Sequence, residues 1–132
     1  MSSPSDEIWN RALDFDVPAP LAGDLAVRRA LTFHGMVHNG GLWYAIEVHA
    51  ADEEFPLDAI AEAYRTLGLE ATAEAVDRAA AEYEQTTGIG DDDAWAEAEE
   101  RINEDYRIDD ADISAAIERT LAQEPELFAP TD

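Results

Sequence analysis

Carboxylates dominate the residues of this chain that could do chemistry. Of 132 residues, 31 are Asp or Glu and eight are basic, all of them Arg, so the formal net charge is −23. Eleven acids and two Arg lie between Asp91 and Asp112. A charge of this sign repels nucleic acid and anionic lipid and favours basic protein surfaces. The composition therefore predicts a basic protein as partner, with no direct nucleic-acid binding and no membrane binding.

The spacing of these acids suggests what such a surface could imitate. Acids on one face of a helix recur about every 5.4 Å, and duplex phosphates follow about every 3.4 Å of axis in each strand. Carboxylates of neighbouring helices could therefore approximate a track of phosphates. The predicted partner-binding surface consists of Asp91, Asp92, Asp93, Glu97, Glu100, Glu104, Asp105, Asp109 and Asp110, joined by Glu70, Glu74, Asp77 and Glu84.

Other interpretations of the acidity stay open. A surface of this kind also suits an immunity or antitoxin protein that neutralises a basic nuclease. Basic content made only of Arg is typical of salt-adapted proteins or of a high-GC coding bias, and then the acids form a solvated face without a partner. Net charge alone does not decide between these, since it governs solubility and non-specific association in any protein.

The histidines offer a second kind of chemistry. His34 and His38 are four residues apart on a predicted helix, so both rings could lie on one face and bind a metal ion, with His49 as a candidate third ligand. Gly35 follows His34 where zinc proteases carry Glu. His34 also falls on a predicted apolar stripe, which favours a core or interface histidine. A metal-dependent hydrolase is therefore the alternative to a binding protein. The favoured interpretation is a protein that is not an enzyme and needs no cofactor.

Further catalytic signatures are absent from the sequence. There is no Cys, which excludes disulfides, thiolate metal sites and a Cys nucleophile. Gly88-Ile89-Gly90 precedes three Asp residues that would repel a phosphate. Asp110 to Ser114 begins like a calcium-binding loop, but Ala115 replaces the required Gly and Leu121 the bidentate Glu. No residue is assigned a catalytic role.

Helix signals must position these residues. Caps and apolar spacing of three and four residues predict helices from Ser3 to about Asp14, Leu21 to His38, Pro56 to Leu67, Leu69 to about Glu84, and Trp95 to Tyr106. A last helix, with Ile113, Ile117 and Leu121 facing inward, is expected to start at caps supplied by Asp109 to Asp112. Asn39-Gly40-Gly41 is expected to end the second helix, because these residues tolerate positive φ. Leu42 to Val48 is a short apolar segment with a weak strand-type alternation, and Thr86 to Gly90 is a predicted loop.

This pattern predicts an all-α fold. We expect one domain over residues 1–132, with six or seven helices, mostly in antiparallel pairs, and with flexible ends at 1–4 and 129–132. Residues 1–10 have no apolar core of a signal peptide, and the strongly apolar stretch from Leu42 to Ile46 is too short to span a membrane. The expected location is the cytoplasm.

Part of the chain resembles a known family. The relevant residues are His38-Asn39-Gly40-Gly41-Leu42-Trp43-Tyr44, then Ala59 to Leu69 with its Leu67-Gly68-Leu69 junction, then the Ala-rich Ala73 to Ala80. These segments resemble a bacterial family of uncharacterised helical domains with an Asn-Gly-Gly-aromatic motif, and that family includes an acidic DNA-mimic protein. Leu42, Tyr44 and Ala45-Ile46 depart from its usual residues.

The resemblance implies an all-helical fold, often dimeric, that binds a protein through acidic surface, for example a helix-turn-helix regulator. It implies a structural role for Asn39, Gly40 and Gly41, whose turn would bring two helices close. It carries over no catalytic residue. Together with the composition, it leads to the hypothesis of a DNA mimic that sequesters a basic regulator or nuclease, with a homodimer as the expected assembly.

Overall fold

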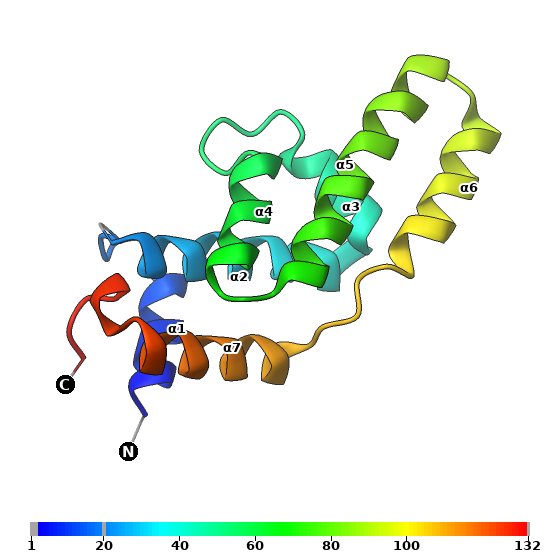
Figure 1. The fold of residues 1–132 in the computed structure, drawn as a ribbon. Helices are drawn as coiled ribbons and strands as arrows, with labels where there is room; N and C mark the ends of the chain where they lie inside the picture. Colours follow the sequence, from blue (N-terminus) through cyan, green and yellow to red (C-terminus); the bar gives the residue numbers. More distant parts are fainter. Residues whose placement is uncertain (1–2, 20, 132) are drawn as a thin grey trace.

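Helix-capping residues set the boundaries of this fold. The computed structural model describes residues 3–19 and 21–131, which contain seven α-helices and one 3₁₀ helix but no strand (Figure 1). The prediction of an all-α, single-domain fold is confirmed. The helices are α1 (Pro4–Leu13), α2 (Ala22–Gly40), α3 (Leu42–His49), α4 (Leu57–Thr66), α5 (Glu70–Ile89), α6 (Asp92–Asn103), α7 (Asp110–Gln123) and the 3₁₀ helix η1 (Pro125–Leu127).

Reciprocal caps begin α1 and α7. The Ser3 hydroxyl accepts the Asp6 N–H at 3.2 Å while Asp6 accepts the Ser3 N–H at 3.3 Å. Asp109 and Asp112 exchange the same two bonds at 3.0 Å each. Such boxes satisfy backbone donors that a helix start leaves without partners. The predicted starts of the first and last helices are therefore confirmed.

Two predicted boundaries are wrong, and the short apolar segment at Leu42 to Val48, which had no assigned element, is helical. Leu42–His49 is helix α3, so the weak strand-type alternation there is overridden by packing of Trp43 and Ile46 into the core. The predicted loop at Thr86 to Gly90 is largely helical, because α5 continues to Ile89 and ends at Gly90 with a left-handed φ of 69°. Helix α6 ends at Asn103, so Tyr106 lies in the segment that leads to α7.

The core lies around α2. This helix packs against α1, α3 and α4, while α5 packs against α3, α4 and α6, and α7 packs against α1. Trp43, Tyr64, Phe33 and Ile60 are each at most 1 % exposed. Burying an apolar side chain of this size contributes about 1.5–3 kcal/mol. This burial is the main favourable term that opposes repulsion between the acids.

An aromatic cluster fixes the α5–α6 pair to this core. The Trp43 ring of α3 lies 5.5 Å from Tyr83 of α5 and 5.1 Å from Trp95 of α6, between ring centroids. Figure 1 shows α5 and α6 side by side, with α6 on the outside of the molecule and a chain segment running from its end to α7. Helix α6 buries only Ala98 and Ile102, so most of its surface faces solvent.

Arginines hold the two ends of the chain. Arg28 of α2 is buried and donates to the carbonyls of Ala12, Arg11, Asp14 and Val17, at 2.6–3.1 Å, where α1 ends and the next segment begins. Arg11 pairs with Asp24 at 2.9 Å and donates to the carbonyls of Ala129 and Pro130.

The predicted flexible ends therefore contain ordered contacts where they are described. Ser3 and Pro4 begin α1, and the Ala129 N–H donates to Asp24 at 2.7 Å. Residues 1–2 and 132 lie outside the described part of the chain. Among the helices that the structure describes, none is long and apolar enough to cross a membrane.

The Arg28 contacts lead to a stability prediction. R28M would leave carbonyls at the end of α1 without their charged donor, and losing hydrogen bonds to a charged group at a buried site costs about 2 kcal/mol or more. Urea denaturation should therefore show a lower midpoint at an unchanged slope. R78M, at an exposed Arg of α5, is the matched control and should leave the midpoint near that of the wild type. Equal midpoints for the two variants would contradict this role of Arg28.

Candidate functional site

The predicted acidic surface is almost entirely exposed. Of its thirteen acids only Asp105 is half-buried. Asp93, Glu97, Glu100 and Glu104 follow one another at spacings of four, three and four residues, which places them on one face of α6 and its C-terminal end. We call these four residues the α6 stripe. It extends over about 16 Å at a rise of 1.5 Å per residue.

Two arginines lie near the α6 stripe without an ion pair to its carboxylates: Arg101, and Arg107, whose Nε–H donates to the Glu104 carbonyl at 3.1 Å. Within residues 3–19 and 21–131, no ion pair or side-chain hydrogen bond engages any of its four carboxylates. Glu97, Glu100 and Glu104 line a shallow depression of about 280 Å³ together with Arg101. Arg101 itself pairs with Glu82 of α5. The stripe therefore presents carboxylates that an external cation or basic side chain could engage.

Several of the other predicted acids have structural partners. Asp91 accepts the Asp93 N–H at the start of α6, and Asp109 caps α7. The hydrogen bonds that Asp109 accepts from backbone N–H groups, with that of Asp112 foremost, lower the pKa of its carboxyl. Asp77 pairs with Arg65 of α4, which also lies 3.9 Å from Glu70. These acids already take part in contacts within the fold, so a binding partner would have to compete with those contacts.

The structure does not bring the α5 acids onto the α6 stripe. Glu70, Glu74, Asp77 and Glu84 share one face of α5 by their spacing of four, three and seven residues. Asp77 points toward Arg65 of α4, whereas Glu82 points toward Arg101 of α6. Asp77 and Glu82 lie about 140° apart around the helix, from 3.6 residues per turn. The single surface expected from the sequence is therefore two separate surfaces.

The Asn39-Gly40-Gly41 turn is a close junction between three helices. Gly41 has a φ of 91°, and a Cβ there would lie 2.8 Å from the side chain of Asn103 at the end of α6. Asn103 in turn accepts the Trp43 N–H at 2.8 Å and so caps α3. A Cβ on Gly40 would lie 2.6 Å from Tyr44, whose ring covers the turn. The structural role predicted for this motif therefore has a geometric basis.

The histidines form a cluster with Asp110 that excludes His49. The Nε2 atom of His34 lies 3.0 Å from Nε2 of His38 and 2.8 Å from Oδ1 of Asp110. His38 Nε2 lies 3.8 Å from the same oxygen. His49 lies elsewhere, with its Nδ1 3.1 Å from the Phe55 carbonyl oxygen and 3.3 Å from Asp52. The third residue beside His34 and His38 is therefore Asp110, and not His49 as the sequence suggested.

A buried row of hydrogen bonds runs from this cluster into the core. His34 Nδ1 lies 2.7 Å from the Tyr106 hydroxyl, which lies 2.8 Å from the Tyr64 hydroxyl, and Tyr64 donates to the Ala30 carbonyl at 3.3 Å. We call these groups the polar chain. Burial lowers the pKa of His34, against the opposing effect of its bond to Asp110. Burial also raises the pKa values of Tyr64 and Tyr106.

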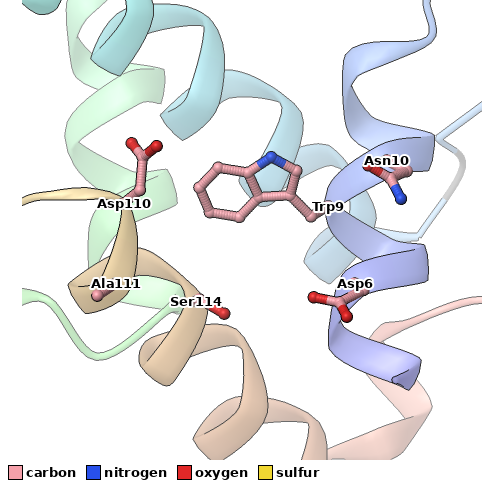
Figure 2. A pocket seen from close by; sticks show the side chains of 6 residues that line it. All are labelled: Asp6, Trp9, Asn10, Asp110, Ala111 and Ser114. Atoms are coloured by element: carbon pink, nitrogen blue, oxygen red, sulfur yellow. The ribbon is translucent and has the colours of Figure 1, made fainter. Parts of the chain in front are cut away.

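An open polar pocket of about 380 Å³ borders the cluster. Asp6, Trp9 and Asn10 of α1 face Asp110, Ala111 and Ser114 of α7 across it (Figure 2). Asp110 belongs to both the pocket and the histidine cluster. Solvent and small ions can therefore reach the Asp110 carboxylate.

Sequence reasoning assigned Asp110 to the acidic surface and missed its contact with His34. The two residues are 76 positions apart in the chain, and local spacing carries no information about such a pair. Tyr106 is the last residue of a helix predicted from the sequence, whereas in the structure it lies between α6 and α7. The position of the Asp109 cap, directly before Asp110, is the only local sign that the latter has a fixed geometry.

Comparison with known proteins gives a family. Residues 23–126 match the family model described as DMP19-like protein. No curated protein and no solved structure matches the chain. The matched span contains α2 to α7, with the histidine cluster, the α6 stripe and the Asn39-Gly40-Gly41 turn.

The Gly41 geometry leads to a prediction with a built-in control. Gly41 and Gly90 both have positive φ, but only at Gly41 would a Cβ meet another side chain. G41A should therefore lower the free energy of unfolding by about 1–3 kcal/mol, a cost typical of a strained non-glycine backbone, and by more than G90A does. The two denaturation midpoints measure this difference. Equal losses would show that the Asn103 contact has no energetic effect.

The raised tyrosine pKa values predict alkaline sensitivity. The unfolded chain releases tyrosine protons near pH 10, whereas folded Tyr64 and Tyr106 keep theirs. The unfolded state thus binds fewer protons above this pH, and stability falls by up to about 1.4 kcal/mol per pH unit for each tyrosine. Y106F should make this fall less steep. Y44F, at an exposed tyrosine, should keep the wild-type slope, and the same slope in all three proteins would contradict the prediction.

Proposed function

This chain belongs to the DMP19-like protein family, and we propose that it is an acidic protein-binding protein that acts as a DNA mimic. Its partner in this proposal is a basic DNA-binding protein, a regulator or a nuclease. The α6 stripe would occupy the groove in which that partner holds phosphates. No catalytic residue takes part, because the proposed mechanism is competition for a binding surface.

The observation that carries the proposal is the unpaired state of the α6 stripe. Four carboxylates lie on one face of an outer helix, and within the described residues none of them is neutralised by an Arg. Arg and Lys side chains of a partner would replace water there and form charge-assisted hydrogen bonds. Helix α6 buries only Ala98 and Ile102, so its other side chains can contact a groove of the partner while the helix stays packed on the core.

The geometry supports imitation of one DNA strand more than of a duplex. Successive carboxylates of the stripe are about 5.5 Å apart along the helix axis, against about 3.4 Å per phosphate in one strand. The stripe alone therefore has a lower charge density than DNA. The net charge of −23 adds long-range attraction, which raises association rates with basic proteins and makes them sensitive to salt.

An immunity or antitoxin protein against a basic nuclease would use the same surface in the same way. The identity of the basic partner separates the two roles. The homodimer expected from the family resemblance remains a prediction, which the mass in solution tests.

Neutralising the α6 stripe tests the proposal. The variant D93N/E97Q/E100Q/E104Q should lose most of its capture of a basic DNA-binding protein from lysate of the source cell, because the carboxylates that pair with the partner are gone. The measurement is the amount of that protein retained on the tagged variant at low and at raised salt, with identification by mass spectrometry. The partner captured by the wild-type protein should be released by salt.

The control removes the same charge elsewhere. E47Q/E53Q/E54Q/E126Q changes four exposed acids outside α5 and α6 and should keep near-wild-type capture. If both variants lose capture equally, the binding follows net charge alone and the acids act only in solvation. If both keep it, the partner binds a different surface.

A further inference from the structure

Three metal-binding atoms converge between α2 and the start of α7. They are the Nε2 atoms of His34 and His38 and a carboxylate oxygen of Asp110, separated pairwise by 3.0, 2.8 and 3.8 Å. In a tetrahedral zinc site with bonds of 2.0–2.1 Å, ligand atoms lie about 3.3 Å apart. The three distances bracket this value. The atoms therefore stand near the corners that three ligands of one ion would occupy.

The polar chain orients His34 for such a role. The Ala30 carbonyl can only accept a proton, and Tyr64 donates to it. With Tyr64 so engaged, Tyr106 donates to Tyr64, and the Nδ1–H of His34 donates to Tyr106. The Nε2 atom of His34 then presents a lone pair toward Asp110 and His38. Outer partners that hold a histidine by its second nitrogen are a regular feature of metal sites.

A lone pair in this place can bind a cation instead of a proton. Two imidazole nitrogens and a carboxylate oxygen are all acceptors when the histidines are neutral with their Nε2 atoms unprotonated, and three acceptors about 3 Å apart repel each other. A divalent ion between them removes that repulsion. The surrounding acids, with Asp109 next to Asp110, add a negative potential that concentrates cations.

Burial and access also suit a metal site. The His34 side chain is 4 % exposed, whereas those of Asp110 and His38 are 71 % and 61 % exposed. One ligand is thus fixed in the core and two lie at the surface, where Asp110 also lines the pocket of Figure 2. Asp110 is the first residue of α7, directly after the Asp109 cap, so its backbone position is set by the capping box.

We propose that His34, His38 and Asp110 bind one divalent transition-metal ion of the zinc class, with solvent at the remaining coordination position. Two imidazoles and one carboxylate favour zinc, whereas magnesium and calcium prefer oxygen ligands alone. The bound ion links α2 to the start of α7. This site is separate from the α6 stripe, and the proposal does not depend on the proposed function.

Zinc binding by the full-length protein tests the site. Equilibrium dialysis against zinc, in excess magnesium to occupy the other acids, should find one tightly bound zinc per chain. H38A and D110N should each weaken that affinity at least about tenfold, since loss of even an outer partner of a metal ligand costs 10–100-fold. Cobalt in place of zinc should give the visible absorption of a tetrahedral site with the wild-type protein and lose it with H38A.

Matched variants separate this site from non-specific uptake. Asp92 is the first residue of α6 after the Asp91 cap, just as Asp110 follows Asp109 in α7, so D92N controls for D110N. It should bind zinc like the wild type. H38A changes an exposed side chain and leaves every carboxylate in place, so it should fold like the wild type. Equal zinc affinity in the wild type, H38A and D110N, or full displacement of zinc by magnesium, would overturn the proposal.

Discussion

Every helix of this fold has to be held in place against a net charge of −23. Within the described residues, four of the eight arginines join helices or chain segments to one another. Arg28 satisfies the carbonyls at the end of α1, Arg11 ties that helix to Asp24 and the C-terminal segment, and Arg65 and Arg101 link α5 to α4 and α6. Acidic residues also stabilise helix starts, because the Asp91 and Asp109 side chains accept hydrogen bonds from backbone N–H groups there. Burial of the large aromatic and aliphatic side chains around α2 supplies the remaining stabilisation.

These contacts leave most of the acids without an ion pair to an arginine within the described residues. The α6 stripe belongs to that remainder, and it lies on the helix that contributes least to the core. A carboxylate engaged in a cap or an internal ion pair would have to give up a bond before it could bind a partner. The stripe has no such bond to give up, which distinguishes it from Asp77, Glu70 and Asp109. The polar chain shows the opposite case, in which His34, Tyr106, Tyr64 and the Ala30 carbonyl are paired in a fixed order inside the molecule.

Local signals in the sequence predicted most of the helices, while contacts between distant residues were beyond them. Ser3 and Asp109 cap helices within three residues of their own positions, and the positive φ of Gly41 ends α2, so these roles follow from local spacing. The helical state of α3 depends on burial of Trp43 against α5 and α6, which overrides a weak local preference. The contact between His34 and Asp110 requires α7 to lie beside α2, and the division of the acids into two surfaces requires the side of α5 on which α6 packs. Both follow only from the tertiary arrangement.

Two separate kinds of binding are proposed for the molecule: basic protein side chains on the α6 stripe, and a metal ion at the cluster between α2 and the start of α7. The central claim is that the α6 stripe occupies the same groove in its partner as DNA does. Competition with duplex DNA tests it most directly, by titrating DNA into the captured complex at constant ionic strength and measuring how much partner is released. The expected result is mutually exclusive binding, with full release of the partner from this protein once DNA saturates it. A stable complex that contains this protein, its partner and DNA together would contradict it.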